Sequence, residues 1–116
     1  MSVHDFDKKF SCSINNLNKS KISDGNKKSI SRFVENCFSE GIGKARIVKY
    51  IYALIKLSTW LEKDFSNTNK DDIKKLVGEI EKSNYSDWSK HDLKVCLKKF
   101  YRWIKGLDEG NPEETR

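Results

Sequence analysis

The stretch SDWSKHDLKVCLKKFYRWIKG, residues 86–106, is the part of the sequence from which we predict the fold. Written as a helix, it places six apolar side chains at the i, i+3, i+4 and i+7 spacing of a buried face. These side chains are Leu93, Cys96, Leu97, Phe100, Trp103 and Ile104. The opposite side of the helix, within about 80° at about 100° per residue, carries His91, Lys94, Lys98, Arg102 and Lys105. The pattern therefore predicts an amphipathic helix with one buried face and one basic face.

A second stretch, KARIVKYIYALIKLSTWLEK at residues 44–63, predicts the central helix of a bundle. Between Ile47 and Ile55 it is apolar around most of its circumference, as expected for a helix surrounded by others. Its exposed face, again within about 80°, contains Arg46, Lys49, Ala53 and Lys56. A basic face on an apolar helix thus occurs twice in the chain.

Three further helices are predicted from apolar spacing and end signals. A helix over 5–19 has Phe6, Phe10, Ile14 and Leu17, and could pack on the bundle or move independently. A helix to about Ser39 begins at an N-cap, Ser23, and ends at a left-handed Gly41. Residues 69–72 predict a capping box for a helix to about Lys82, and Ser86 or Ser89 caps the last helix. Phe65 in the intervening loop should point inward, Trp60 and Trp103 should be core residues, and Tyr85 and Trp88 would close the entrance to the last helix.

The composition indicates one small all-α domain. The chain has 116 residues, of which 36% are hydrophobic, with one Pro and six Gly. No run approaches the roughly 20 apolar residues that cross a membrane, and the N-terminal segment lacks the apolar core of a signal peptide. We therefore expect a soluble protein inside the cell.

Nothing in the sequence predicts a metal centre or a cofactor site. Cys12, Cys37 and Cys96 form no CxxC pair, so we expect reduced thiols, two of them at buried helix positions. His4 and His91 lack the spacing of metal ligands. Phosphate-binding glycine loops, HExxH and GxSxG are absent from the sequence. We accordingly predict no cofactor and no catalytic residues in this chain.

The net charge of +6 is concentrated in the two amphipathic stretches. Residues 43–63 hold five Lys or Arg and one Glu, and residues 86–106 hold six Lys or Arg and two Asp, so each stretch carries +4. The rest of the chain is therefore net negative. A localised positive surface is typical of proteins that bind nucleic acid, although a solvated charged face is the alternative for each helix.

The segment from Glu40 to Gly106 resembles the core-binding domain of tyrosine recombinases, also called phage integrases. The likeness is closest to their archaeal integrase-like branch, covers residues 26–106 and rests on the order and spacing of several pieces. These are Gly41-Ile42-Gly43, Tyr50, Trp60-Leu61, residues 69–73 and residues 97–104. The resemblance implies a compact four-helix SAM-like bundle, here with an additional N-terminal helix. It divides the chain into an N-terminal arm, 1–22, a DNA-binding domain, 23–106, and a linker, 107–116.

In that family the second and fourth helices of the bundle face double-stranded DNA, so the resemblance implies a set of contact residues. In the first of these helices they are Lys44, Arg46, Lys49 and Tyr50, and in the second Ser89, Lys90, His91, Lys94 and Lys98. Charge and helical position alone add Lys56 and Arg102. Gly43 departs from the family pattern, because Ser or Thr usually stands there.

The resemblance also implies partners and a setting. The family's catalytic residues lie in a downstream domain, so we expect residues 107–116 to lead toward a catalytic domain that is absent here. The domain alone should bind DNA as a monomer without cutting it, and other recombinase protomers would join the full-length protein. We expect a nucleoid-associated cytoplasmic protein of a prokaryote, with an archaeal source favoured.

Two other classes of function remain open at this point. A SAM-like helical module with a basic surface could bind an acidic protein instead of DNA. A complete small enzyme is disfavoured because the sequence offers no constellation of titratable residues.

Overall fold

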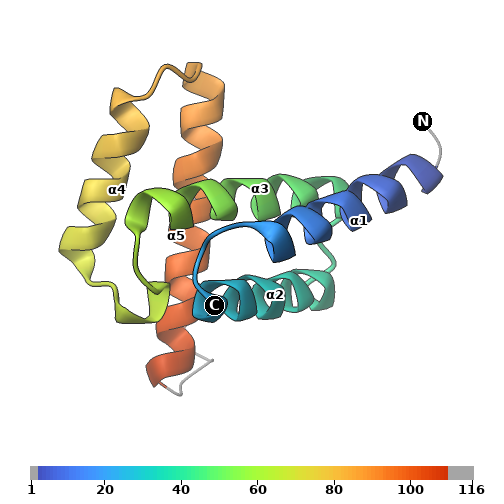
Figure 1. Cartoon of the computed structure of the whole chain (residues 1–116), viewed down its shortest axis with the longest axis horizontal. Coiled ribbons are helices and arrows are strands. Elements are labelled where there is room, and N and C mark those ends of the chain that lie inside the picture. The colour runs from blue at the N-terminus through green and yellow to red at the C-terminus, as the bar shows by residue number, and fades with distance from the viewer. Residues whose placement is uncertain (1–2, 110–116) are drawn as a thin grey trace.

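Five α-helices and one short 3₁₀ helix make up the described part of the chain. The computed structural model describes residues 3–109, and side chains within residues 7–106. The elements are α1 (Val3–Lys19), α2 (Asp24–Ser39), α3 (Lys44–Leu61), η1 (Phe65–Asn67), α4 (Lys70–Lys82) and α5 (Asp87–Glu109). Figure 1 shows α1 and α2 beside α3, and a hairpin of α4 and α5 that crosses α3 steeply. The protein is an all-α helical bundle, as predicted.

The central helix of the bundle is α3, which contacts each of the other four α-helices. Its buried side chains include Ile47, Ile51, Leu54 and Leu57, all without exposed surface. The predicted central position of this helix is confirmed. The predicted end at residue 63 is wrong by two residues, because Glu62 adopts a left-handed conformation with φ of 61° and stops the helix at Leu61.

Helix α5 buries the face that its sequence predicts. Five of the six expected side chains, all except the half-buried Trp103, are buried in the core. Phe100 lies at the centre, with its ring centroid 5.1 Å from that of Phe33 and 4.9 Å from that of Phe65, both edge to face. Such pairs stabilise a core beyond their buried area. The predicted end of this helix at Gly106 is wrong, because the helix continues to Glu109; residues 110–116 lie outside the described range.

The predicted caps of the helices are confirmed. The Ser23 side chain accepts a hydrogen bond from the backbone N–H of Asn26 at 3.1 Å. Gly41 follows α2 with φ of 80°, the left-handed conformation that glycine adopts without strain. Asn69 and Asp72 form the reciprocal capping box of α4. These local interactions fix where the helices begin and end, and so which side chains can share a face.

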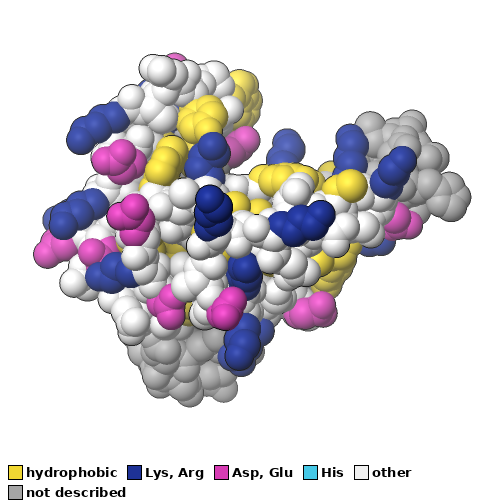
Figure 2. All heavy atoms as spheres, viewed as in Figure 1, with side chains coloured by type: hydrophobic (Ala, Val, Ile, Leu, Met, Phe, Trp, Pro, Cys, Tyr) yellow, Lys and Arg dark blue, Asp and Glu magenta, His cyan; other side chains and the backbone are white. Residues whose placement is uncertain are grey.

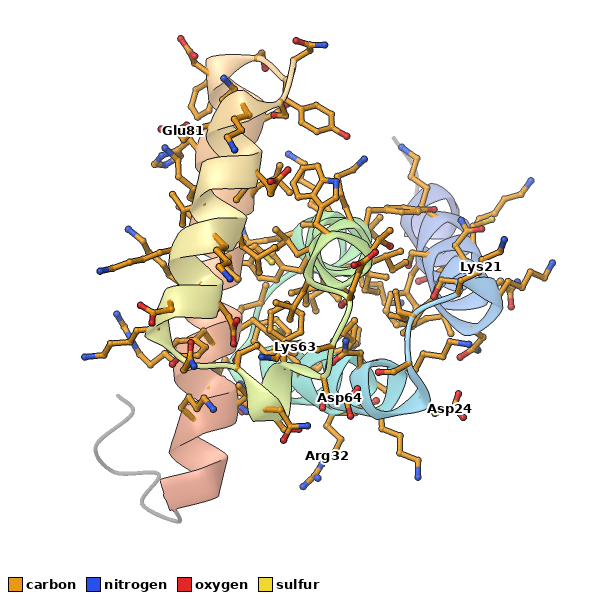
Figure 3. All side chains as sticks on the ribbon, turned by 60° about the vertical axis from the view of Figure 1, so that its left-hand side comes forward. Lys21, Asp24, Arg32, Lys63, Asp64 and Glu81 are labelled. Carbon is orange, nitrogen blue, oxygen red and sulfur yellow. The ribbon has the colours of Figure 1, made fainter. Side chains whose placement is uncertain are left out.

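A buried amide joins the start of α2 to the loop after α3. The side-chain Nδ2 of Asn26 donates to the carbonyl of Lys63, and its Oδ1 accepts from the backbone N–H of Phe65, both at 2.9 Å. Beside it, a Cβ added to Gly25 would clash with the Asp64 carboxylate, which would have to move aside. Figure 3 shows Lys63 and Asp64 on this loop next to the start of α2. The joint holds Phe65 in the core, as predicted.

Helix α1 packs along α3 and does not stand apart from the bundle. Leu17 is fully buried in the common core, and Ile14 packs against the core's edge. The rings of Phe10 and Phe38 meet edge to face at 5.5 Å. Of the four apolar positions predicted for this helix, Phe6 lies outside the described side chains.

Candidate nucleic-acid interface

A groove of about 550 Å³ lies between α3 and the N-terminal part of α5. Side chains from both basic stretches line it, among them Arg46, Lys49 and Lys56 from α3 and Ser89 from α5. Hydrophobic and basic side chains gather where the α4–α5 hairpin rises above α3 (Figure 2). Five residues predicted from separate segments as DNA contacts, these four and Tyr50, thus border one concavity.

Helix α3 carries basic residues in its first turn, where the partial positive charge of the helix end disfavours them. Lys44 and Arg46 lie in the first turn of α3, which has no acidic residue, and its N-cap, Gly43, has no side chain to bond the open N–H groups. The N-terminal end of a helix carries partial positive charge, so cations there are unfavourable and anions favourable. Lys44 is ion-paired with Asp7 of α1. Arg46 and Lys49 are exposed and have no ion pair among the described side chains.

Lys56 is held over two aromatic rings at one end of the groove. Its Nζ lies 4.9 Å from the ring centroid of Tyr85 and 5.8 Å from that of Trp60. The attraction between an ammonium group and a ring face fixes the charge at this place. Lys56 therefore joins α3 to the loop that precedes α5.

The α5 side of the groove is less basic than the sequence suggested. Asp92 and Val95 line the groove together with Ser89. Lys90 and Lys94 point instead toward α4: the Nζ of Lys90 donates to the backbone carbonyl of Glu81 at 2.9 Å, and that of Lys94 lies 3.5 Å from its carboxylate. Glu81 is labelled on α4 in Figure 3. An exposed ion pair of this kind contributes at most about 1 kcal/mol, so another anion can replace the carboxylate.

The remaining predicted residues of α5 face a second groove or open solvent. Lys98 and Arg102 line a smaller groove of about 440 Å³ between α2 and α5. His91 is exposed, and its ring lies 6.4 Å from that of Trp88. The predicted contact residues of α5 that carry charge thus face α4, the second groove or solvent, and Ser89 is the predicted contact on α5 that lines the groove shared with α3.

Tyr50, another predicted contact, is largely buried. Its side chain has 9% exposure and its ring centroid lies 6.0 Å from that of Phe33. Burial also keeps two cysteine thiols protonated and therefore poorly nucleophilic. It raises the pKa of the Cys37 thiol to about 11 and that of the Cys96 thiol further. Cys12 is exposed.

Aromatic side chains at the groove are what the sequence-based prediction missed. Tyr52 is 44% exposed and Tyr85 37%, and both line the groove. Trp88, 77% exposed, does not close the helix entrance against the core. It lies one helical turn before Asp92, which lines the groove. A signal for Tyr52 existed, because it follows Lys49 by three residues and therefore shares its face.

Within residues 7–106, no three His, Cys, Asp or Glu side chains gather in a way that suits a metal ion. In the range 3–109, no helix is long and apolar enough to cross a membrane. No family model, curated protein or solved structure matches the chain. The likeness to tyrosine recombinases therefore stays a prediction from sequence, and the interface stands on its own geometry.

Proposed function

We propose that this domain binds double-stranded DNA through two neighbouring surfaces. One is the groove between α3 and α5, and the other is the outward face of α5, which carries His91, Lys98 and Arg102. The observation that carries the proposal is that three cations of the first basic stretch, Arg46, Lys49 and Lys56, line one concavity with residues of the second stretch, which begins more than twenty residues further along the chain. Arg46 and Lys49 line it without ion pairs among the described side chains, and Arg46 lies in the first turn of α3, a helix end that favours anions. Helix stability does not explain this arrangement, whereas phosphate binding does.

Phosphate contacts supply most of the affinity in this proposal. Lysine and arginine that neutralise phosphates release condensed counterions, which makes the affinity depend on salt. Lys49, Lys56 and Lys98 suit this role. Arg46 can in addition bond the O6 and N7 of guanine, and His91 can donate to a base edge. Lys94 would exchange its partner on α4 for a phosphate at small cost.

In the wider proposal, the domain grips one half of a recombination site beside a catalytic domain of a tyrosine recombinase. The support is the resemblance over residues 26–106, in which the two helices that face DNA correspond to α3 and α5. The domain's own part is binding and positioning. Strand cleavage would belong to residues of the catalytic domain, and further protomers would assemble through the complete protein.

The test is the affinity for a random-sequence 20-base-pair duplex at four salt concentrations. The double variant Arg46→Ala/Lys49→Ala should lower the slope of log K against log salt by about 2 units, since each phosphate contact contributes about 0.9. The matched control is Lys28→Ala/Lys74→Ala, two exposed lysines on α2 and α4 away from both grooves. It removes the same charge and should leave most of the affinity and of the slope.

Equal losses in the two double variants would overturn the proposal, because they would show that only the total charge matters. All four side chains are exposed, so folding should survive, and a thermal melt of each variant verifies this.

A second candidate function is docking of an acidic protein. The apolar side chains at the groove, Tyr52 and Val95 among them, favour this alternative. It predicts that an acidic amphipathic peptide displaces DNA and that Val95→Ala weakens that peptide.

A further inference from the structure

The exposed apolar surface of this protein is mainly aromatic and lies at one place. Among the described side chains, four large hydrophobic residues are exposed, and three of them are aromatic: Tyr52, Tyr85 and Trp88. Two line the groove between α3 and α5, and Trp88 lies one helical turn before Asp92, which also lines it. An isolated exposed aromatic residue needs no explanation, but three around one cationic groove do.

Contacts with neighbouring side chains restrict two of the three rings, Tyr52 and Tyr85. The Tyr52 hydroxyl accepts a hydrogen bond of 2.9 Å from Asn16 on α1. Tyr85 lies 6.5 Å from Trp60 between ring centroids, and Lys56 is placed over its face. Because these contacts restrict the rings before any ligand arrives, binding to them loses little conformational entropy.

Cations line the same groove as the rings. Arg46, Lys49 and Lys56 border the groove, opposed by one carboxylate, that of Asp92. Proteins that bind single strands combine such a positive groove with aromatic rings on which successive bases stack. The groove volume of about 550 Å³ lies in the range of sites that enclose small organic groups.

We propose that the groove binds unpaired nucleotides, whose bases stack on Trp88, Tyr52 and Tyr85 while their phosphates meet Arg46, Lys49 and Lys56. This inference rests on the proposed function and names the form of DNA that the site prefers. A paired duplex hides its base faces inside the stack, so it gains nothing from exposed rings in a concavity. Unpaired nucleotides beside a duplex would occupy the groove while the duplex contacts the outward face of α5.

An acidic amphipathic peptide is the competing occupant. A peptide of that kind gains most from aliphatic surface, and Val95 is the one aliphatic side chain among the four exposed large hydrophobic residues in the described range. The aromatic majority favours bases.

The experiment compares a blunt 14-base-pair duplex with the same duplex carrying a six-thymine overhang. We expect the overhang to raise affinity about five- to hundredfold, from one or two stacked bases, and to quench the fluorescence of Trp88. Trp88→Ala should lower the ratio of the two affinities at least about fivefold, the contribution of one stacked base, and Trp88→Phe should restore most of it. Val95→Ala, at the same groove but without a ring, is the control and should keep the ratio.

The outcomes separate this inference from the function on which it rests. If both DNA forms bind with equal affinity and Trp88→Ala changes nothing, the inference fails and duplex binding stands. If neither form binds at low salt but an acidic amphipathic peptide does, both fail and the groove belongs to a protein partner. Trp88 is highly exposed, so its variants should fold normally.

Discussion

Replacing Asn26 by alanine should destabilise the fold more than any surface change on the same helix. Asn26 is only 2% exposed, and its amide bonds the carbonyl of Lys63 and the N–H of Phe65. Alanine leaves both backbone groups without their partner. The helix would lose its tie to the loop that places Phe65 in the core.

The size of the destabilisation follows from the two backbone groups that lose their hydrogen-bond partner, the carbonyl of Lys63 and the N–H of Phe65. An unpaired buried polar group costs about 1–3 kcal/mol. The N–H of Phe65 is fully enclosed and should cost the larger share, whereas water can reach the carbonyl of the exposed Lys63. Alanine regains a few tenths of a kcal/mol through its higher helix propensity. The net loss should be about 2–4 kcal/mol, or a fall in Tm of roughly 8–16 °C for a domain of this size.

Urea unfolding followed by circular dichroism measures this loss, with Asn36→Ala as the matched control. Asn36 lies on the same helix, but its amide bonds only the exposed carboxylate of Glu40, so its loss should cost under about 0.5 kcal/mol. Asn26→Asp is a second variant, nearly equal in shape. It keeps the acceptor for Phe65 but sets an oxygen against the Lys63 carbonyl, so it should be at least as destabilising at pH 7. Asn26 variants as stable as Asn36→Ala would refute the reasoning.

Two other predictions concern glycine and cysteine. Gly41→Ala should destabilise the fold by about 1 kcal/mol, because the residue has a φ of 80°. Gly78→Ala, in open space within α4, should stabilise the fold by up to about 1 kcal/mol. Thermal melts should therefore show a lower Tm for the first variant and a higher Tm for the second, and shifts in the same direction would contradict the prediction. A thiol reagent at pH 8 should modify Cys12 at once but Cys37 only after unfolding, since burial raises the pKa of Cys37 to about 11. In the unfolded chain that thiol ionises near pH 8.5, so its contribution to stability is complete below that pH and is lost as pH rises toward 11. Urea titrations at pH 8 and 10.5 should show this loss in the wild type and less of it in Cys37→Ala, and the reasoning fails if the two proteins lose the same amount.

Local interactions explain why so much of the fold was predictable. Helix caps at Ser23, Gly41 and Asn69 are formed by residues within five positions of one another, so the sequence alone contains both partners. Apolar spacing then selects the buried face of each helix without reference to its neighbours. The ends of α3 and α5 were misplaced because the conformation of Glu62 and the continuation past Gly106 carry no comparable signal.

Helical periodicity is enough to specify that two helices each carry an apolar face and a basic face. How those basic faces are used depends on tertiary packing. The pairing of α4 with α5 directs Lys94 toward Glu81, and the crossing of this hairpin over α3 sets Lys56 over Tyr85. A helical wheel gives the direction of a side chain but not the neighbour that it meets, since that neighbour depends on packing between residues far apart in sequence.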